Sequence, residues 1–332
     1  MRKVLIYILG FVLLCFLIPI IFTKRPEKAV VAINEASKES DNNQNENKTD
    51  TKTPIIVKLL HAETGEVEEL EMDKYLYGVV SAEMPANFEK EALKAQAIVA
   101  RTYTEYKIYK GSKHENADIC DDSKCCQAWI SKEKRFEKWN EVDRENNWNK
   151  ITSAVDETSG KIITYDGAPI NAFFHSNSGG TTETVANVWG GSNYPYLQSV
   201  ETSGEDGYTQ YASTVTLSKE EVLQKMQAEY PETTIDWTQE KPIQITEYNE
   251  SGRVKTIQIG NKSISGVEAR TIFGLKSAKF NVQVGENVQF DVVGYGHGVG
   301  LSQTGADAMA KTGATAEQII NHYYTGVKIE NI

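Results

Sequence analysis

Residues 89–110 read EKEALKAQAIVARTYTEYKIYK, and this stretch is the clearest helical signal in the chain. Apolar side chains recur at Leu93, Ala97 and Ala100 with the spacing of one helical face, and Gly111 follows as a natural C-terminal cap. The pattern predicts a long helix over residues 89–110 that buries one stripe of its surface.

Further helices and strands are expected on both sides of this helix. Capping residues at Asp73, Ser302 and Thr315 precede helices predicted at residues 73–84, 303–311 and 316–324. β-Branched or alternating patterns predict strands at residues 55–60, 67–71, 161–165, 170–174, 243–259 and 280–293, the last two stretches each turning back on themselves. We therefore expect an α+β fold of mixed helices and antiparallel strands, forming one large or two tightly associated lobes.

The composition limits the classes of protein that the chain can belong to. Of its 332 residues 40% are hydrophobic and 24% are charged, which suits one large domain or two modest ones and excludes a disordered tail or a collagen. Four cysteines are too few for a disulfide-dense module. The net charge of −11 argues against nucleic acid as a partner, because binding phosphates requires a basic surface.

The N-terminal segment differs from the rest of the chain. Residues 4–22 are almost uninterrupted apolar residues, which as a helix would span about 28 Å, close to the hydrocarbon thickness of a bilayer. A polar stretch without periodicity follows. We expect a transmembrane signal anchor at residues 1–23, a flexible linker at residues 24–53 and a folded domain at residues 54–330 outside the cytoplasm. A cleaved signal peptide is the alternative.

Glu83 is the first candidate for chemistry. It lies at the end of the helix predicted over residues 73–84, where the helix dipole and partial burial both raise the pKa of a carboxyl group, as a general acid requires. Arg101, in the long helix, can pair with Glu83 or hold a polar substrate. The plain alternatives are a solvated Glu at a helix end and an Arg whose charged group reaches the solvent.

Two polar, glycine-rich stretches are further candidates. Residues 173–182 (FFHSNSGGTT) place small polar side chains after a predicted strand. Residues 294–306 (GYGHGVGLSQTGA) have alternating glycines around His297 and match neither common nucleotide-binding fingerprint. Such glycine density lets a ligand approach the backbone closely, where His297 can contact it. A structural loop or turn is the alternative for each stretch.

Four side chains of metal-ligating types lie close together in the sequence: His114, Cys120, Cys125 and Cys126. Three cysteines and a histidine match the ligand types of a closed structural zinc site. Adjacent cysteines are sterically awkward as ligands of one ion, so His175 is an alternative to one of them. A disulfide, which a location outside the cytoplasm permits, and free thiols are the competing interpretations.

Five blocks of the sequence, taken in order, resemble the stage II sporulation protein D family. The blocks are YGVVSAEMP (residues 77–85), EALKAQA to ARTY (91–103), FHSNSGG (174–180), WGG to YPYL (189–197) and GHGVGLSQTGA (296–306). The resemblance covers roughly residues 54–330, and the predicted N-terminal anchor also matches the family.

The resemblance implies a lytic transglycosylase that cleaves peptidoglycan during engulfment in sporulation, anchored by one span in the mother-cell membrane. The family prefers glycan strands that a partner amidase has stripped of their stem peptides. Such an enzyme uses the 6-hydroxyl of its own substrate as nucleophile and forms a 1,6-anhydro product, so one carboxyl group suffices where ordinary glycosidases use two.

The resemblance also suggests roles for individual residues. Glu83 matches the catalytic acid/base, and the positions expected to hold the glycan are Arg101, Tyr196, His297, Ser302 and Gln303. Gln198 stands where the family commonly has Lys, which puts that contact in doubt. Some members with similar cysteines bind zinc, which implies a structural ion here. A non-catalytic glycan-binding enhancer of a cell-wall amidase and a zinc peptidase or amidase remain as other classes.

Overall fold

The computed structural model describes residues 54–332 of the chain. The predicted anchor at residues 1–23 and linker at residues 24–53 lie outside this range. Among the helices of residues 54–332, none combines the length and apolar character that crossing a membrane requires.

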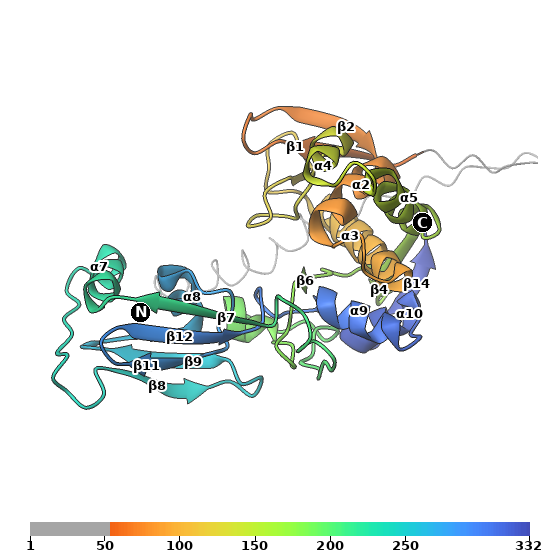
Figure 1. Cartoon of the computed structure of the whole chain (residues 1–332). Helices are drawn as coiled ribbons and strands as arrows, with labels where there is room; N and C mark the ends of the chain where they lie inside the picture. The colour runs from red at the N-terminus through yellow and green to blue at the C-terminus, as the bar shows by residue number, and fades with distance from the viewer. Residues whose placement is uncertain (1–53) are drawn as a thin grey trace, which may run out of the picture. The chain divides into compact units, whose positions relative to one another are not determined.

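Helices and strands are mixed along the described chain, and most of the strand pairs are antiparallel, which agrees with the expected α+β class (Figure 1). The helices are α2 (Met72–Glu83), α3 (Lys90–Lys110), α4 (Lys132–Lys138), α5 (Arg144–Asp156), α6 (Val185–Trp189), α7 (Lys219–Glu229), α8 (Gly266–Phe273), α9 (Gln303–Lys311) and α10 (Ala316–Tyr323). The strands are β1 (Ile56–Leu60), β2 (Val67–Glu71), β3 (Ile119–Cys120), β4 (Lys161–Tyr165), β5 (Ala168–Pro169), β6 (Phe174–His175), β7 (Ala212–Leu217), β8 (Ile243–Tyr248), β9 (Val254–Ile259), β10 (Lys262–Ser265), β11 (Phe280–Val284), β12 (Val288–Val293), β13 (Leu301–Ser302) and β14 (Lys328–Asn331).

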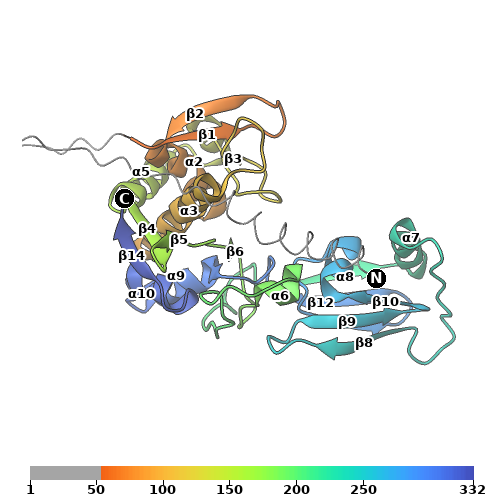
Figure 2. The same cartoon turned by 180° about the vertical axis from the view of Figure 1, so that it is seen from behind.

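A first hydrophobic core surrounds α3. Helices α2 and α5 lie beside it in both Figure 1 and Figure 2, and strand β4 and helices α9 and α10 also contact it. The prediction of one buried stripe was wrong, because every residue of α3 from Ala95 to Thr104 is buried. The small side chains of Ala95, Ala97 and Ala100 allow neighbours to approach this helix from all sides.

A second core lies between two three-stranded sheets, with strand orders β10-β9-β8 and β11-β12-β7. Both hairpins predicted here are confirmed, with β8 antiparallel to β9 and β11 antiparallel to β12. Helices α7 and α8 begin with capping boxes. The hydroxyls of Ser218 and Ser265 accept from the backbone N–H groups of Glu221 and Glu268, whose carboxylates accept from the backbone N–H groups of the two serines. The sequence analysis did not predict these two helices.

One predicted hairpin is shorter than expected. The Asp166–Gly167 turn is present, with both residues in the left-handed region, but strand β5 after it spans only Ala168–Pro169. The chain then forms β6, which pairs in parallel with β13 and places His175 opposite Ser302. This short pair brings the two glycine-rich stretches of the sequence side by side.

Candidate functional site

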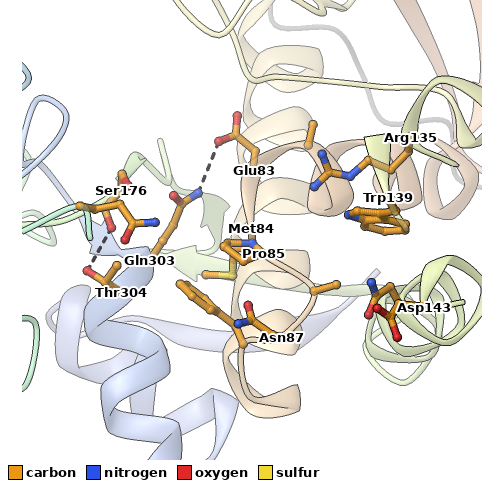
Figure 3. A pocket seen from close by; sticks show the side chains of 15 residues that line it. Glu83, Met84, Pro85, Asn87, Arg135, Trp139, Asp143, Ser176, Gln303 and Thr304 are labelled. Atoms are coloured by element: carbon orange, nitrogen blue, oxygen red, sulfur yellow. Dashed lines mark hydrogen bonds between the residues drawn. The ribbon is translucent and has the colours of Figure 1, made fainter. Parts of the chain in front are cut away.

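A cavity of about 630 Å3 opens beside Glu83 (Figure 3). Its walls come from five parts of the chain: the end of α2 with the turn after it, α4 with the segment that leads into α5, the start of α9, and the single residues Ser176 and Gln210. In this view Gln303 lies on one side of Met84 and Pro85, and Arg135 and Trp139 lie on the other. The tertiary fold therefore assembles one cavity from polar groups that the sequence separates.

Two donors hold the Glu83 carboxyl group at the edge of this cavity. The backbone N–H of Ala128 donates to Oε1 at 2.7 Å, and Nε2 of Gln303 donates to Oε2 at 3.4 Å. Burial raises the pKa of Glu83, and the two hydrogen bonds oppose this shift only in part. A carboxyl group in these surroundings retains its proton at higher pH than an exposed Glu and can donate it to a ligand in the cavity.

Gln303 is the second predicted site residue in this cavity. It is the first residue of α9, where Ser302 caps the helix by accepting a hydrogen bond from the backbone of Gly305. Its Nε2 lies 3.5 Å from Oε1 of Gln96 on α3 as well as near Glu83. The side chain is therefore held between two helices and points at the carboxyl group.

Arg101 occupies a different environment from the one expected. Its guanidinium is only 1% exposed, and its Nη2 pairs with Asp73 at 2.8 Å. Nη1 donates to the carbonyl of Thr158 at 2.7 Å, and no described acid other than Asp73 forms an ion pair with it. The predicted pairing with Glu83 is not formed. Arg101 instead ties α3 to the start of α2, the helix whose end carries Glu83.

Tyr196 and His297 also lie outside the lining of the Glu83 cavity. The Tyr196 hydroxyl accepts a hydrogen bond from the backbone of Asn171 at 3.1 Å. The His297 ring packs on Trp189, with ring centroids 4.9 Å apart, and burial lowers its pKa well below the usual histidine value. His297 is thus a neutral member of an aromatic cluster.

Ser302 is completely buried and belongs to a hydrogen-bond network around Glu205. The Glu205 carboxylate accepts hydrogen bonds from the hydroxyls of Ser178, Ser302 and Thr304 and from the backbone N–H groups of Ser178 and Gly180. These donors belong to both glycine-rich stretches, so one buried acid holds the two together. Sequence reasoning missed Glu205, because nothing near it in the sequence marks it.

The glycines of the second stretch make room for neighbouring parts of the protein. A Cβ atom on Gly300 would lie 1.9 Å from the Phe173 carbonyl oxygen, and one on Gly298 would lie 2.3 Å from the Arg253 guanidinium. Both glycines also have φ in the left-handed region. Neighbouring segments therefore occupy the space beside Gly298 and Gly300, and a ligand contact of this stretch stays a prediction.

The predicted metal-ligating residues do come together. The ligand atoms of His114, Cys120, Cys125 and Cys126 all lie within 4.8 Å of one another, and the three thiols are free. His114 Nε2 is 3.4 Å from the sulfurs of both Cys125 and Cys126, and these sulfurs are 3.7 Å apart. Tetrahedral zinc places its ligand atoms about 3.5–3.8 Å apart, so His114, Cys125 and Cys126 have the spacing of zinc ligands and the cluster of four could hold a metal ion.

His175, the alternative ligand, lies elsewhere. Its Nδ1 is 3.1 Å from the Val299 carbonyl oxygen, and burial together with the charge of Arg253 lowers its pKa to about 3.

The cysteine cluster is connected to Glu83 along the chain. Cys126 is two residues from Ala128, whose N–H binds Glu83, and between them Gln127 is anchored to the Tyr75 hydroxyl. An ion held by the cluster would stabilise this segment.

Sequence reasoning missed the α4 side of the cavity. Arg135 and Trp139 line it, and the guanidinium carbon lies 4.7 Å from the centroid of the Trp139 ring. The only signal was the mixture of charged and aromatic residues in residues 132–139, which does not indicate which face meets Glu83.

Comparison of the sequence with known proteins gives its family. A sequence model described as "Stage II sporulation protein" matches residues 61–165, which include Glu83 and the cysteine cluster. The stage II sporulation protein D of Bacillus amyloliquefaciens is 33% identical over 338 residues, covering 99% of this chain and 96% of that protein. The chain belongs to the stage II sporulation protein D family.

Two other relatives show the range of the family. The stage II sporulation protein D of Bacillus subtilis (strain 168) is 34% identical, over 91% of this chain and 85% of its own length. A protein named amidase enhancer from the same organism is 29% identical over 76% of this chain. The match covers only 40% of that protein, so the similarity concerns a part of it.

Proposed function

We propose that this protein is a lytic transglycosylase that cleaves the glycan strands of peptidoglycan during sporulation. The main support is the Glu83 carboxyl group, which has two hydrogen-bond donors, a raised pKa and an open cavity beside it. Membership of the sporulation family and similarity to an amidase enhancer support a role in cell-wall processing.

One carboxyl group serves both halves of the proposed reaction. Protonated Glu83 gives its proton to the glycosidic oxygen as the bond to C1 of the muramoyl ring breaks. The resulting carboxylate takes the proton from the 6-hydroxyl of the same ring as that oxygen bonds to C1, which regenerates the acid and releases a 1,6-anhydro product. The carboxylate does not attack C1 itself, and no water is consumed.

The neighbouring residues have distinct proposed roles. Gln303 and the Ala128 N–H orient the carboxyl group, and Arg101 and Ser302 position the helices that carry Glu83 and Gln303. The Tyr196 hydroxyl binds the backbone of Asn171 and the His297 ring packs on Trp189, and both contacts are proposed to fix the segments around the glycine-rich stretches. Arg101, Tyr196, His297 and Ser302 are therefore proposed as positioning residues, without direct contact to the reacting atoms.

The shape of the site suits a polymer. The Glu83 cavity adjoins a second hollow of about 620 Å3, and the two share Pro85, Asn87, Phe88 and Gln210. Adjoining hollows offer room for several sugar units on one side of the reacting bond.

We propose that the cysteine cluster holds a structural zinc ion. Four protein ligands close a tetrahedral site and leave no position for a substrate, unlike the open sites of zinc hydrolases. The N-terminal segment would anchor the enzyme in the mother-cell membrane, with residues 54–332 outside the cytoplasm. Engulfment proteins in the same membrane, including an amidase that removes stem peptides, are the proposed partners.

Digestion of purified, peptide-free peptidoglycan tests the proposal directly. The purified protein should release 1,6-anhydro-muramoyl products, identified by mass spectrometry, and the Glu83→Gln variant should release none. The similarity to an amidase enhancer favours one alternative, a non-catalytic module. That alternative replaces ours if neither protein yields product and both accelerate an added amidase equally.

A further inference from the structure

Arg135 is a cation without a counterion in the wall of the Glu83 cavity. Among the described residues that line this cavity it is the only positively charged side chain. It projects from α4, a helix capped by Ser131, and its guanidinium lies against the Trp139 ring (Figure 3). The ring covers one side of the group and leaves its hydrogen-bonding edge for other partners.

Arg135 differs in its partners from Arg101 and Arg253, the two arginines of residues 54–332 that are fully buried. Arg101 pairs with Asp73, and Arg253 donates to the carbonyls of Ser178 and Thr181, each at 2.8 Å. The guanidinium of Arg135 forms no ion pair with, and donates no hydrogen bond to, any residue within 54–332, and only its backbone N–H donates, to the Ser131 carbonyl. Its Nε atom is buried and lacks an acceptor, which is costly for a guanidinium unless a ligand supplies one.

The cavity itself does not supply a counterion. Asp143 lines the same cavity but is exposed and forms no ion pair with Arg135 among the described residues. Burial lowers the pKa of Arg135, the direction expected for a cation whose lost hydration is not replaced. A planar, two-oxygen acceptor matches the unoccupied edge of a guanidinium better than a single hydroxyl does.

We propose that Arg135 binds a carboxylate of the glycan next to the bond that Glu83 protonates, namely the lactyl carboxylate of a muramoyl residue without a stem peptide. This inference rests on the proposed function, which makes a muramoyl glycan the ligand. When a peptide is attached, the same group is an amide and carries no charge. Arg135 is then a specificity residue that selects strands already stripped of their peptides.

Binding to a chain that cannot cleave its ligand tests this site. In a Glu83→Gln background, two tetrasaccharides of alternating N-acetylglucosamine and N-acetylmuramic acid are compared by calorimetry, one with free lactyl carboxylates and one with lactyl methylamides. The free acid should bind more tightly. Adding Arg135→Gln should weaken binding of the acid by roughly tenfold to a hundredfold, the range of a charge-assisted hydrogen-bonded pair, and leave the amide within about threefold.

Control variants separate recognition from folding. Lys138→Gln removes a positive charge from the same helix outside the cavity and should change neither affinity. Arg135→Lys keeps the charge without the planar edge and should fall between the wild-type residue and Gln in its preference for the acid. If Arg135→Gln does not fold, judged by its thermal unfolding, the Arg135→Lys preference decides the question.

Two results would overturn the assignment: equal loss of both ligands on Arg135→Gln, or no preference for the acid when Arg135 is present. Either result can be told apart from failure of the proposed function. A chain with Glu83 intact that releases no anhydro products, while Arg135 still selects the acid, would refute the enzyme and retain the carboxylate site.

Discussion

Glu83 and Glu205 are two enclosed carboxyl groups with opposite surroundings. Glu205 accepts five hydrogen bonds from Ser178, Gly180, Ser302 and Thr304 and is 2% exposed. Glu83 accepts two and borders a cavity. A carboxylate with every lone pair satisfied stabilises the fold, and one with few donors beside open space is available for proton transfer. The two glycine-rich stretches, which were also candidates in the sequence, belong to the saturated network.

The largest expected effect is on catalysis at Glu83. Glu83→Gln should lower the rate of anhydro-product release by about 10²–10⁴-fold, since the amide cannot donate or accept the proton. Glu137→Gln, an exposed change on α4, should leave the rate as it is. The rate of product release measures this effect. A variant that retains more than a tenth of the activity, a change of less than about 1.4 kcal/mol in the activation free energy, contradicts the proposed role of Glu83.

The Glu83→Gln substitution, although it should lower activity, should leave the stability of the fold unchanged or increase it at high pH. Because folding raises the pKa of Glu83, the stability that this group contributes is present below its unfolded pKa and is lost as pH rises through its folded pKa. Gln does not titrate, so above that range Glu83→Gln should unfold at the same or higher urea concentration than the wild type. Urea unfolding at acid and alkaline pH measures this, and a variant less stable at alkaline pH contradicts it.

Glu205 should show the second largest effect, on folding. Glu205→Ala leaves three hydroxyls and two N–H groups without their acceptor and should reduce the free energy of unfolding by about 3–5 kcal/mol. Urea denaturation measures this loss, and Glu201→Ala, an exposed neighbour, serves as the control. A loss no greater than that of the control would show that the network is not what holds the glycine-rich stretches together.

Removal of the proposed zinc ion should lower both the stability of the fold and the activity at Glu83. Stripping zinc from the His114, Cys120, Cys125 and Cys126 cluster should lower the thermal midpoint by at least about 5 °C. Activity should fall with loosening of the Ala128 segment and should return with added zinc, since Ala128 donates to Glu83. Metal analysis together with thermal unfolding tests this; a protein that carries no zinc and unfolds at the same temperature with or without chelator does not contain the proposed ion.

Gln303 should give the smallest effect. Its hydrogen bond to the Glu83 carboxylate opposes the rise in pKa, so Gln303→Leu should raise the pKa of Glu83 further. Since the proton donor is the protonated form, activity falls as pH rises through this pKa, and the variant should keep its activity to a higher pH. A pH profile of kcat/KM measures the shift, and a profile displaced to lower pH would show that Gln303 does not donate to Glu83.

The sequence predictions were accurate where a feature depends on residues close together in the sequence. The helix over residues 89–110, the Thr315 capping box and the hairpins of residues 243–259 and 280–293 are confirmed, because turns and caps depend on residues a few positions apart. The His114 and cysteine cluster is also local and is confirmed as a group. Glu83 stood out for its position at a helix end, and the resemblance to a family drew attention to Gln303.

The sequence by itself therefore determined the α+β class, the local elements and the family, and it identified Glu83 as the candidate acid. Tertiary structure alone decided its surroundings. Gln303 is 220 positions from Glu83, Glu205 is 97 positions from Ser302, and Arg101 is 28 positions from Asp73. Hydrogen bonds and burial at these separations arise only when distant segments pack, and they distinguish a saturated acid from an available one. The same packing brought the unpaired Arg135 into the cavity of Glu83.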